Sequence, residues 1–267
     1  MRIGVLGCAG RMGRTVMAEV LAAEACELAG GAEAAGHPDV GRDLGTLAGA
    51  EPVGIAVGND ARALVQGSDV VIEFSTPEAS LEHAGLVAEH GRAHVIGTTG
   101  LSDTEAAALA RAAERTPIVW APNMSLGVNL LLGLAEQVAR ALGPGAFDAE
   151  ILEMHHRHKV DAPSGTALAL GEAVARGRGV SLERVAERAR DGYTGARGGG
   201  NIGFAVLRGG DVVGEHVVIF AGAGERIELG HRATDRRIFA RGAIHAARWA
   251  VGKPPGLYGM ADVLGLG

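Results

Sequence analysis

The residues best suited to chemistry in this chain are five consecutive side chains, His155 to Lys159, each able to carry or donate a proton. Lys159 is one of only two lysines among 25 lysine and arginine residues. Arginine stays protonated in proteins, whereas a lysine can release its proton when its surroundings disfavour the charge. A lysine in the same short run as three histidines therefore indicates a proton-transfer site.

The segment after this run adds an anion-binding feature. A proline leads into Ser164, Gly165 and Thr166, which predict the start of a helix with the serine as its cap. The first N–H groups of a helix have no partners within it and attract anions. With Arg157 and Lys159 as added positive charge, the sequence predicts a site that binds a dicarboxylate and transfers a proton to it.

A glycine motif opens the chain. Gly7, Gly10 and Gly13 follow an apolar run typical of a strand and begin a helical pattern. Their G-x-x-G-x-x-G spacing permits a tight turn, close approach of a pyrophosphate and close packing of helix on strand. Glu33 ends the next strand-like run, where an acidic residue is expected to bind the adenosine ribose. The motif favours a dinucleotide site over a bare turn between strand and helix.

Two more loops, residues 97–100 and 121–125, follow later strand-like runs. Doubly wound sheets bind their ligands at the carboxyl ends of the strands, which is where these loops lie. We expect the two loops to contact the nicotinamide and its ribose, rather than to serve only as turns.

The residues after Glu33 bear on the choice of cofactor. Ala34 follows it directly, so no arginine adjoins Glu33 to receive the 2′-phosphate of NADPH. Arg42 or His37 could still reach that phosphate from the following loop. We predict that NADH works at least as well as NADPH.

The element pattern changes once along the chain. Up to about residue 125, short apolar runs alternate with helical patterns, which predicts a Rossmann-like, doubly wound parallel sheet. A long apolar helix follows, and after it three strand-like runs succeed one another without intervening helices. These runs predict an α+β domain with a mixed sheet. We expect a dinucleotide-binding domain at 1–124, a substrate-binding domain at 125–235, and a helix and tail at 236–267 that return to the first domain.

Composition excludes several classes of protein. The net charge of −6 and the lack of an aromatic, basic stripe argue against nucleic-acid binding. No apolar run approaches the roughly 20 residues that span a bilayer, and no signal peptide is evident, so we expect a cytoplasmic protein without membrane contact. Cys8 and Cys26 form no disulfide framework. His83, His90 and His94 are expected at the surface or at helix ends.

Three segments together carry a family resemblance. The run H-H-R-H-K-V-D-A-P-S-G-T-A, the amino-terminal G-x-x-G-R-M-G and the V-I-G-T-T-G segment resemble the 4-hydroxy-tetrahydrodipicolinate reductase (dihydrodipicolinate reductase) family over essentially the whole chain. The resemblance implies that NADH or NADPH reduces a cyclic imine dicarboxylate, with loss of water, in bacterial lysine and diaminopimelate synthesis. It also implies a homotetramer built through the sheet of the second domain, residues 125–235.

The resemblance also implies roles for individual residues. His155 would be the general acid/base and Lys159 a proton donor, while His156, Gly165 and Thr166 would bind the substrate. The implied cofactor-binding residues are Gly7, Cys8, Ala9, Gly10, Arg11, Met12, Glu33, Gly97, Thr98, Thr99, Ala121, Pro122, Asn123 and Met124. The residue types alone leave open whether His155 or Lys159 delivers the proton.

Other functions fit the sequence less well. A zinc site is disfavoured because Arg157 and Lys159 repel a dication and no cysteine or carboxylate ligand is evident nearby. Ser164 lacks the G-x-S-x-G setting of a hydrolase nucleophile. A module that only senses NAD needs no proton donor. Another NAD(P)-dependent oxidoreductase, acting on a sugar or amino acid, would not need the predicted anion site.

Overall fold

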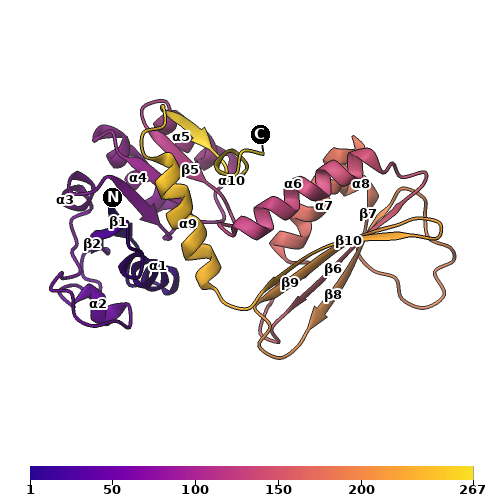
Figure 1. The fold of residues 1–267 in the computed structure, drawn as a ribbon, viewed down its shortest axis with the longest axis horizontal. Coiled ribbons are helices and arrows are strands. Elements are labelled where there is room, and N and C mark those ends of the chain that lie inside the picture. Colours follow the sequence, from indigo (N-terminus) through magenta and orange to yellow (C-terminus); the bar gives the residue numbers. More distant parts are fainter. Residues whose placement is uncertain (267) are drawn as a thin grey trace. The chain divides into compact units, whose positions relative to one another are not determined.

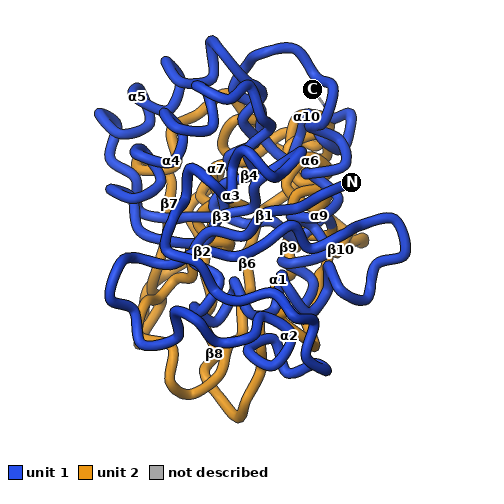
Figure 2. Tube along the Cα trace, turned by 90° about the vertical axis from the view of Figure 1, so that its left-hand side faces the viewer, with its two compact units in different colours: residues 1–126, 237–267 blue, residues 127–236 orange. Residues whose placement is uncertain are grey.

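The computed structural model describes residues 1–266, and the chain divides into two compact units. Unit 1 comprises residues 1–126 together with the chain from residue 237 onward, and unit 2 comprises residues 127–236 (Figure 2). The chain therefore leaves unit 1 once and returns to it after completing unit 2. Within residues 1–266, no helix is long and apolar enough to cross a membrane.

Unit 1 is built on a six-stranded parallel sheet with the order β11-β5-β4-β3-β1-β2 (Figure 1). Its strands are β1 (Arg2–Leu6), β2 (Glu27–Ala32), β3 (Val70–Glu73), β4 (Ala93–Ile96), β5 (Pro117–Trp120) and β11 (Gly256–Tyr258). Because β2 and β3 flank β1 on opposite sides, the strand order reverses at β1. Doubly wound sheets bind ligands beyond the carboxyl ends of the strands at such a switch point.

Helices cover both faces of this sheet. They are α1 (Arg11–Leu21), α2 (Leu44–Leu47), α3 (Ala61–Gln66), α4 (Pro77–Glu89), α5 (Asp103–Ala113), α9 (Arg237–Ala250) and α10 (Met260–Val263). Alternate strand residues serve the two faces: Val70 and Ile72 join the core formed with α1 and α9, whereas Val71 joins the core formed with α3 and α4. This double burial explains why the short strands are apolar throughout.

Unit 2 contains a five-stranded mixed sheet with the order β10-β9-β6-β8-β7. Its strands are β6 (Asp148–His155), β7 (Ala186–Glu187), β8 (Ile202–Arg208), β9 (Gly214–Ala221) and β10 (Arg226–Ala233), and its helices are α6 (Leu126–Ala141), α7 (Gly165–Arg178) and α8 (Leu182–Val185). The central strand β6 runs antiparallel to β9 and parallel to β8. Residues from β6, α6 and α7 share one buried core, which includes Ile151, Leu131 and Leu170.

The predicted fold class is confirmed, since a Rossmann-like parallel sheet is joined by a second unit with a mixed sheet. The sequence patterns did not predict β6, although it is the central strand of unit 2. Two of its buried positions hold Glu153 and His155, so the strand lacks the apolar alternation that marks a half-buried strand.

Candidate active site

The glycine loop of unit 1 has a backbone that only glycine fits at two positions. Gly7 has a φ of 69°, and a Cβ there would lie 2.5 Å from the carbonyl oxygen of Phe74. A Cβ on Gly13 would lie 2.1 Å from the carbonyl oxygen of Gly7, so this glycine lets α1 pack directly on the loop. Helix α1 begins at Arg11 without a side-chain cap, so its first N–H groups are available to phosphate oxygens.

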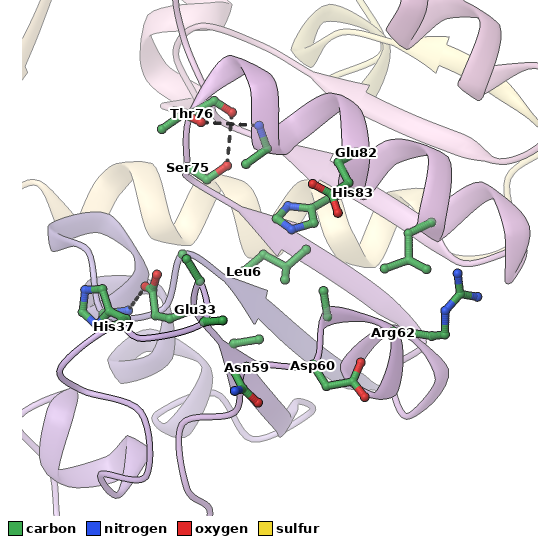
Figure 3. Close-up of a pocket in the computed structure, with 18 of the residues that line it drawn as sticks. Leu6, Glu33, His37, Asn59, Asp60, Arg62, Ser75, Thr76, Glu82 and His83 are labelled. Carbon is green, nitrogen blue, oxygen red and sulfur yellow. Dashed lines mark hydrogen bonds between the residues drawn. The ribbon is translucent and has the colours of Figure 1, made fainter.

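Glu33 lies at the end of β2, beside this loop. Its Oε1 accepts a hydrogen bond of 2.6 Å from the backbone N–H of Ala9, which fixes the carboxylate next to the turn. Gly7, Ala9 and Gly10 line a cavity of about 920 Å³ at the switch point. Glu33 lines the same cavity, together with Leu6, Ser75 and His83 (Figure 3). Cavities of this size hold small molecules and cofactors, so the geometry fits a dinucleotide.

The remaining predicted cofactor residues do not line this cavity. Thr98 is buried, and its hydroxyl accepts hydrogen bonds from Ser75 N at 3.1 Å and from Ser80 Oγ at 2.9 Å. Met124 is also buried, and its carbonyl oxygen lies so close to Gly242 of α9 that a Cβ there would clash. Hydrogen bonds to Thr98 and the close packing of α9 on Met124 therefore hold the two loops in place. The predicted contacts of the two loops with the cofactor stay predictions.

The last residue of β3 is a buried carboxylate, Glu73, whose partners Ser75 and His83 line the cavity. Glu73 Oε1 accepts hydrogen bonds from Ser75, from Ser80 and, at 2.8 Å, from His83 Nδ1. His94 Nε2 lies 2.9 Å from the other oxygen, Oε2. The prediction of a surface or helix-end position is thus wrong for His94, which is fully buried in β4.

Asp39 is a second buried carboxylate of unit 1 and binds two arginines. Arg14 Nη2 lies 3.0 Å from Asp39 Oδ2, and Arg42 pairs with Oδ1. The backbone N–H of Asp39 also donates to His37 Nδ1 at 3.2 Å. Arg42 and His37, which the sequence suggested for a 2′-phosphate, are therefore both bound to Asp39.

In unit 2, strand β6 places Glu153 and His155 on the same buried face, two residues apart. His155 Nδ1 lies 2.6 Å from Glu153 Oε2, and both side chains are almost fully buried. Arg208 of β8 forms a bidentate pair with the two carboxylate oxygens of Glu153, at 2.8 and 2.9 Å. Ser164 N donates to Glu153 Oε1 at 3.0 Å, so the carboxylate also contacts the start of α7.

Burial and charge set the protonation states of this cluster. Burial acts to raise the pKa of Glu153, but the hydrogen bonds from Arg208 and His155 lower it overall, so the carboxylate is ionised. Burial lowers the pKa of His155, and the charges of Lys159 and Arg208 act in the same direction against Glu153. Burial also lowers the pKa of the neighbouring His216 to about 4, which leaves that ring neutral at pH 7.

The predicted proton donor and substrate ligands lie in the segment after β6. Lys159 is partly buried, and its Nζ lies 2.8 Å from the carboxylate of Asp161. His156 is half-buried next to His158, with ring centroids 6.4 Å apart. Their roles stay predictions. Within residues 1–266, no three histidine, cysteine or carboxylate side chains are arranged to hold a metal ion.

Helix α7 starts as the sequence predicted. Ser164 is its N-cap, with Oγ accepting from Ala167 N at 3.2 Å, and the same oxygen lies 3.0 Å from His216 Nε2. Gly165 is exposed at the first helical position, and a Cβ there would meet nothing within 4 Å. The first turn of α7 therefore has open space in front of it, which suits an anion.

Comparison with known proteins covers both units. Family models described as "Dihydrodipicolinate reductase, N-terminus" and "Dihydrodipicolinate reductase, C-terminus" match residues 1–124 and 127–264. The chain belongs to the dihydrodipicolinate reductase family. The family predicted from the sequence is thus confirmed, and the Rossmann-like unit is an NAD(P)H-binding unit.

Relatives agree along the whole chain. It is 58% identical to the 4-hydroxy-tetrahydrodipicolinate reductase of Parvibaculum lavamentivorans, covering 100% of this chain and 98% of the relative. Identity to the enzyme of the same name from Afipia carboxidovorans is 56%, with the same coverage of each chain. A dipicolinate-bound dihydrodipicolinate reductase from Paenisporosarcina sp. TG-14 superposes with a TM-score of 0.79 at 26% identity, covering 98% of both chains.

Several residues of the cluster escaped the sequence analysis. Glu153, Arg208 and His216 contact His155 or its partners, and Asp161 contacts Lys159. The pairing of Asp161 with Lys159 could have been found, because the two residues are close in sequence. Arg208 and His216 lie more than 50 residues from His155, and only the sheet brings them to it.

Proposed function

We propose that this chain reduces the cyclic imine dicarboxylate formed from 4-hydroxy-tetrahydrodipicolinate to tetrahydrodipicolinate, with release of water, in lysine and diaminopimelate biosynthesis. The observation that carries the proposal is the cluster of unit 2, where a buried His155–Glu153 pair adjoins the Lys159 segment and the start of α7. Membership of both units in one reductase family, and a structural relative with bound dipicolinate, support the same substrate class.

The residues of unit 2 supply binding and proton transfer. NAD(P)H supplies the hydride. The first turn of α7, at Gly165 and Thr166, binds one substrate carboxylate, and His156 contacts the substrate. Addition of a hydride to a conjugated imine leaves an electron-rich carbon or nitrogen that must take up a proton. Lys159 donates that proton, and His155 serves as the general acid/base.

NADH is proposed to serve at least as well as NADPH. Ala34 and Ala35 follow Glu33 and offer no positive charge, and Glu33 itself repels a 2′-phosphate. Asp39 supports the proposal further, because it pairs with Arg42 and with Arg14, whose Nε donates to the carbonyl oxygen of Ala9 in the glycine loop. The ratio of kcat/KM for the two cofactors tests it, and a clear preference for NADPH would contradict it.

A homotetramer is proposed to form through the sheet of unit 2. The face of β6 opposite the buried cluster presents Leu152 and Met154, which are only half-buried, and Leu207 of β8 is 48% exposed. Apolar residues left open on a sheet face indicate a protein interface. Sedimentation equilibrium tests the assembly, and a monomer at micromolar concentration would contradict it. The cytoplasmic location stays a prediction.

The reaction is tested by following NADH oxidation while the preceding synthase generates the substrate in place from pyruvate and aspartate semialdehyde. Wild-type protein is compared with Lys159→Ala and His155→Ala, and His158→Ala serves as the control because His158 is exposed in the same run. Loss of proton transfer should lower kcat by about 100- to 10,000-fold in the first two variants. Absence of turnover by wild-type protein that still binds NADH would refute the substrate assignment.

A further inference from the structure

The carboxylate of Glu153 joins the elements of unit 2 that carry the proposed chemistry. It lies on β6, faces His216 of β9 across the sheet and pairs with Arg208 of β8. One oxygen, Oε2, contacts His155, and the other, Oε1, accepts from the backbone of Ser164 at the start of α7. The imidazole and the anion-binding end of α7 are therefore fixed to one side chain.

This contact decides which nitrogen of His155 can exchange a proton. The ionised carboxylate of Glu153 can only accept hydrogen bonds, so Nδ1 of His155 must carry a hydrogen. The reactive lone pair or exchangeable proton is then on Nε2, next to Gly214 of β9, where a Cβ would lie 3.0 Å from it. A neutral imidazole without this contact would divide its population between the two tautomers.

Arg208 gives the carboxylate a permanent counter-charge. Its two terminal nitrogens bind both oxygens of Glu153, and Nη2 also donates to the carbonyl oxygen of Asp161 at 2.7 Å. Asp161 in turn pairs with Lys159, so Arg208 links Glu153 to the segment that carries the proposed proton donor. Because Arg208 balances the charge of Glu153, His155 can lose its proton without leaving an unpaired buried anion.

We propose that Glu153, held by Arg208, is the positioning residue of this site: it fixes the tautomer of His155 and ties the imidazole to the first turn of α7. The proposal rests on the proposed function, because positioning matters only if His155 exchanges protons with the substrate. Glu153 acts through His155 and Ser164, and it is not itself a proton carrier in the reaction.

The charges around His155 predict the direction of a pH effect. Glu153 on the same strand favours the protonated ring, whereas Lys159 and Arg208 disfavour it. The neighbouring His216 of β9 carries no charge at pH 7, because burial lowers its pKa to about 4. Replacement of Glu153 by glutamine removes the favourable charge and lowers the pKa of His155 further. Replacement of Arg208 by methionine removes an unfavourable charge and raises that pKa. The two substitutions therefore shift the same titration in opposite directions.

The experiment compares Glu153→Gln and Arg208→Met with wild-type protein in pH profiles of kcat and kcat/KM. We expect Glu153→Gln to lower kcat by about 10- to 100-fold, part of what a general acid or base contributes. The limb of the profile assigned to His155 should move to lower pH in Glu153→Gln and to higher pH in Arg208→Met. KM for NADH should stay unchanged, because the cofactor cavity belongs to unit 1.

Glu150→Gln is the matched control. Glu150 lies on the same strand and is paired with two arginines, Arg190 at 2.7 Å and Arg197 at 2.8 Å, but it contacts no histidine. Its substitution removes the same charge from β6 and should leave the profile in place. Equal profiles for Glu153→Gln and Glu150→Gln, or shifts of Glu153→Gln and Arg208→Met in the same direction, would overturn the proposal.

Imidazole NMR separates this proposal from the proposed function. Titration of the ¹⁵N-labelled ring of His155 reports the tautomer and the direction of the pKa shift without turnover. If wild-type protein has no reductase activity but the ring shows the Nδ1–H tautomer and the opposite shifts, the substrate assignment fails, whereas the control of the His155 tautomer by Glu153 is confirmed. If the ring populates both tautomers in wild-type protein, the positioning role fails whatever the activity.

Discussion

Each unit of this protein buries a glutamate against histidine, and the two arrangements behave differently. Glu73 in unit 1 contacts His83 Nδ1 at 2.8 Å, and Glu153 in unit 2 contacts His155 Nδ1 at 2.6 Å. Both carboxylates are almost completely buried. The residue types, the atoms and the distances are thus nearly the same in both units.

The two carboxylates differ in what else balances their charge. Glu73 lies against His83 and His94, whereas Glu153 has the permanent cation Arg208. Burial opposes the charge of His83, but the hydrogen bond and the charge of Glu73 raise its pKa overall. Burial first, and then the charges of Lys159 and Arg208, lower the pKa of His155 overall, although Glu153 acts to raise it. His83 therefore holds its proton, because it is itself a counter-ion of the buried glutamate. His155 can exchange its proton, because Arg208 is the counter-ion of Glu153.

This difference is expected to be largest in catalysis. His155→Asn should lower kcat by about 100- to 10,000-fold, because general acid–base catalysis contributes that much. His94→Asn should keep kcat near the wild-type value and instead reduce stability by about 1–3 kcal/mol, because it leaves Glu73 short of a buried partner. Steady-state kinetics and urea unfolding separate the two effects. A comparable loss of kcat in His94→Asn would break the comparison.

Removal of the unit 1 carboxylate should be the largest change in stability. Glu73→Ala removes the acceptor of Ser75, Ser80 and His83 and the counter-charge next to the buried His94, which should destabilise unit 1 by about 3–5 kcal/mol. Trp120 and Trp249, the two tryptophans of the chain, both lie in unit 1, so their fluorescence reports its unfolding. Glu78→Ala, at an exposed position of α4, is the control. Equal urea midpoints for the two variants would contradict the structural role.

The sequence predicted the parts of the site that local chemistry determines. The turn at Gly7 and the cap at Ser164 each depend on residues a few positions apart, and both occur where the sequence placed them. Glycine supplies the positive φ at the turn, and the serine hydroxyl binds an N–H three residues later. Such features can be predicted from sequence because backbone geometry and residue type are directly linked.

The polar clusters could not be predicted in this way. Glu153 and His155 occupy buried strand positions where apolar residues are the rule, so the pattern of β6 resembles no half-buried strand. Arg208 is 55 residues from Glu153, and the parallel pairing of β6 with β8 brings it there. His94 gave a weak signal, since it lies in a four-residue strand, A-H-V-I, whose other residues are apolar and which is buried throughout. Pairing across a sheet decides these contacts.

Asp39 sharpens the comparison, because two arginines pair with this third buried carboxylate. Asp39→Asn should release Arg14 and Arg42 and allow one of them to bind a 2′-phosphate. One charge-assisted contact should raise the NADPH/NADH ratio of kcat/KM by about tenfold. Asp43→Asn is the control, since Asp43 caps α2 in the same loop and its carboxylate binds backbone N–H groups. An unchanged ratio in Asp39→Asn would show that Asp39 does not set selectivity.

The smallest expected effect is an opposite pH dependence of stability in the two units. The raised pKa of His83 means that its stabilisation is complete below its unfolded value of 6.5 and is lost as the pH rises through the folded value. The lowered pKa of His155 means that the unfolded state binds its proton more tightly, so stability falls as the pH drops below 6.5. With cofactor absent, the stability difference between wild-type protein and His83→Gln, followed by tryptophan fluorescence, should shrink above this pH. Proteolysis of unit 2 follows the stability of wild-type protein and of His155→Gln. Below pH 6.5 the wild-type protein should lose stability relative to His155→Gln. If the contributions of His83 and His155 to stability changed with pH in the same direction, Arg208 would not be what distinguishes the two histidines.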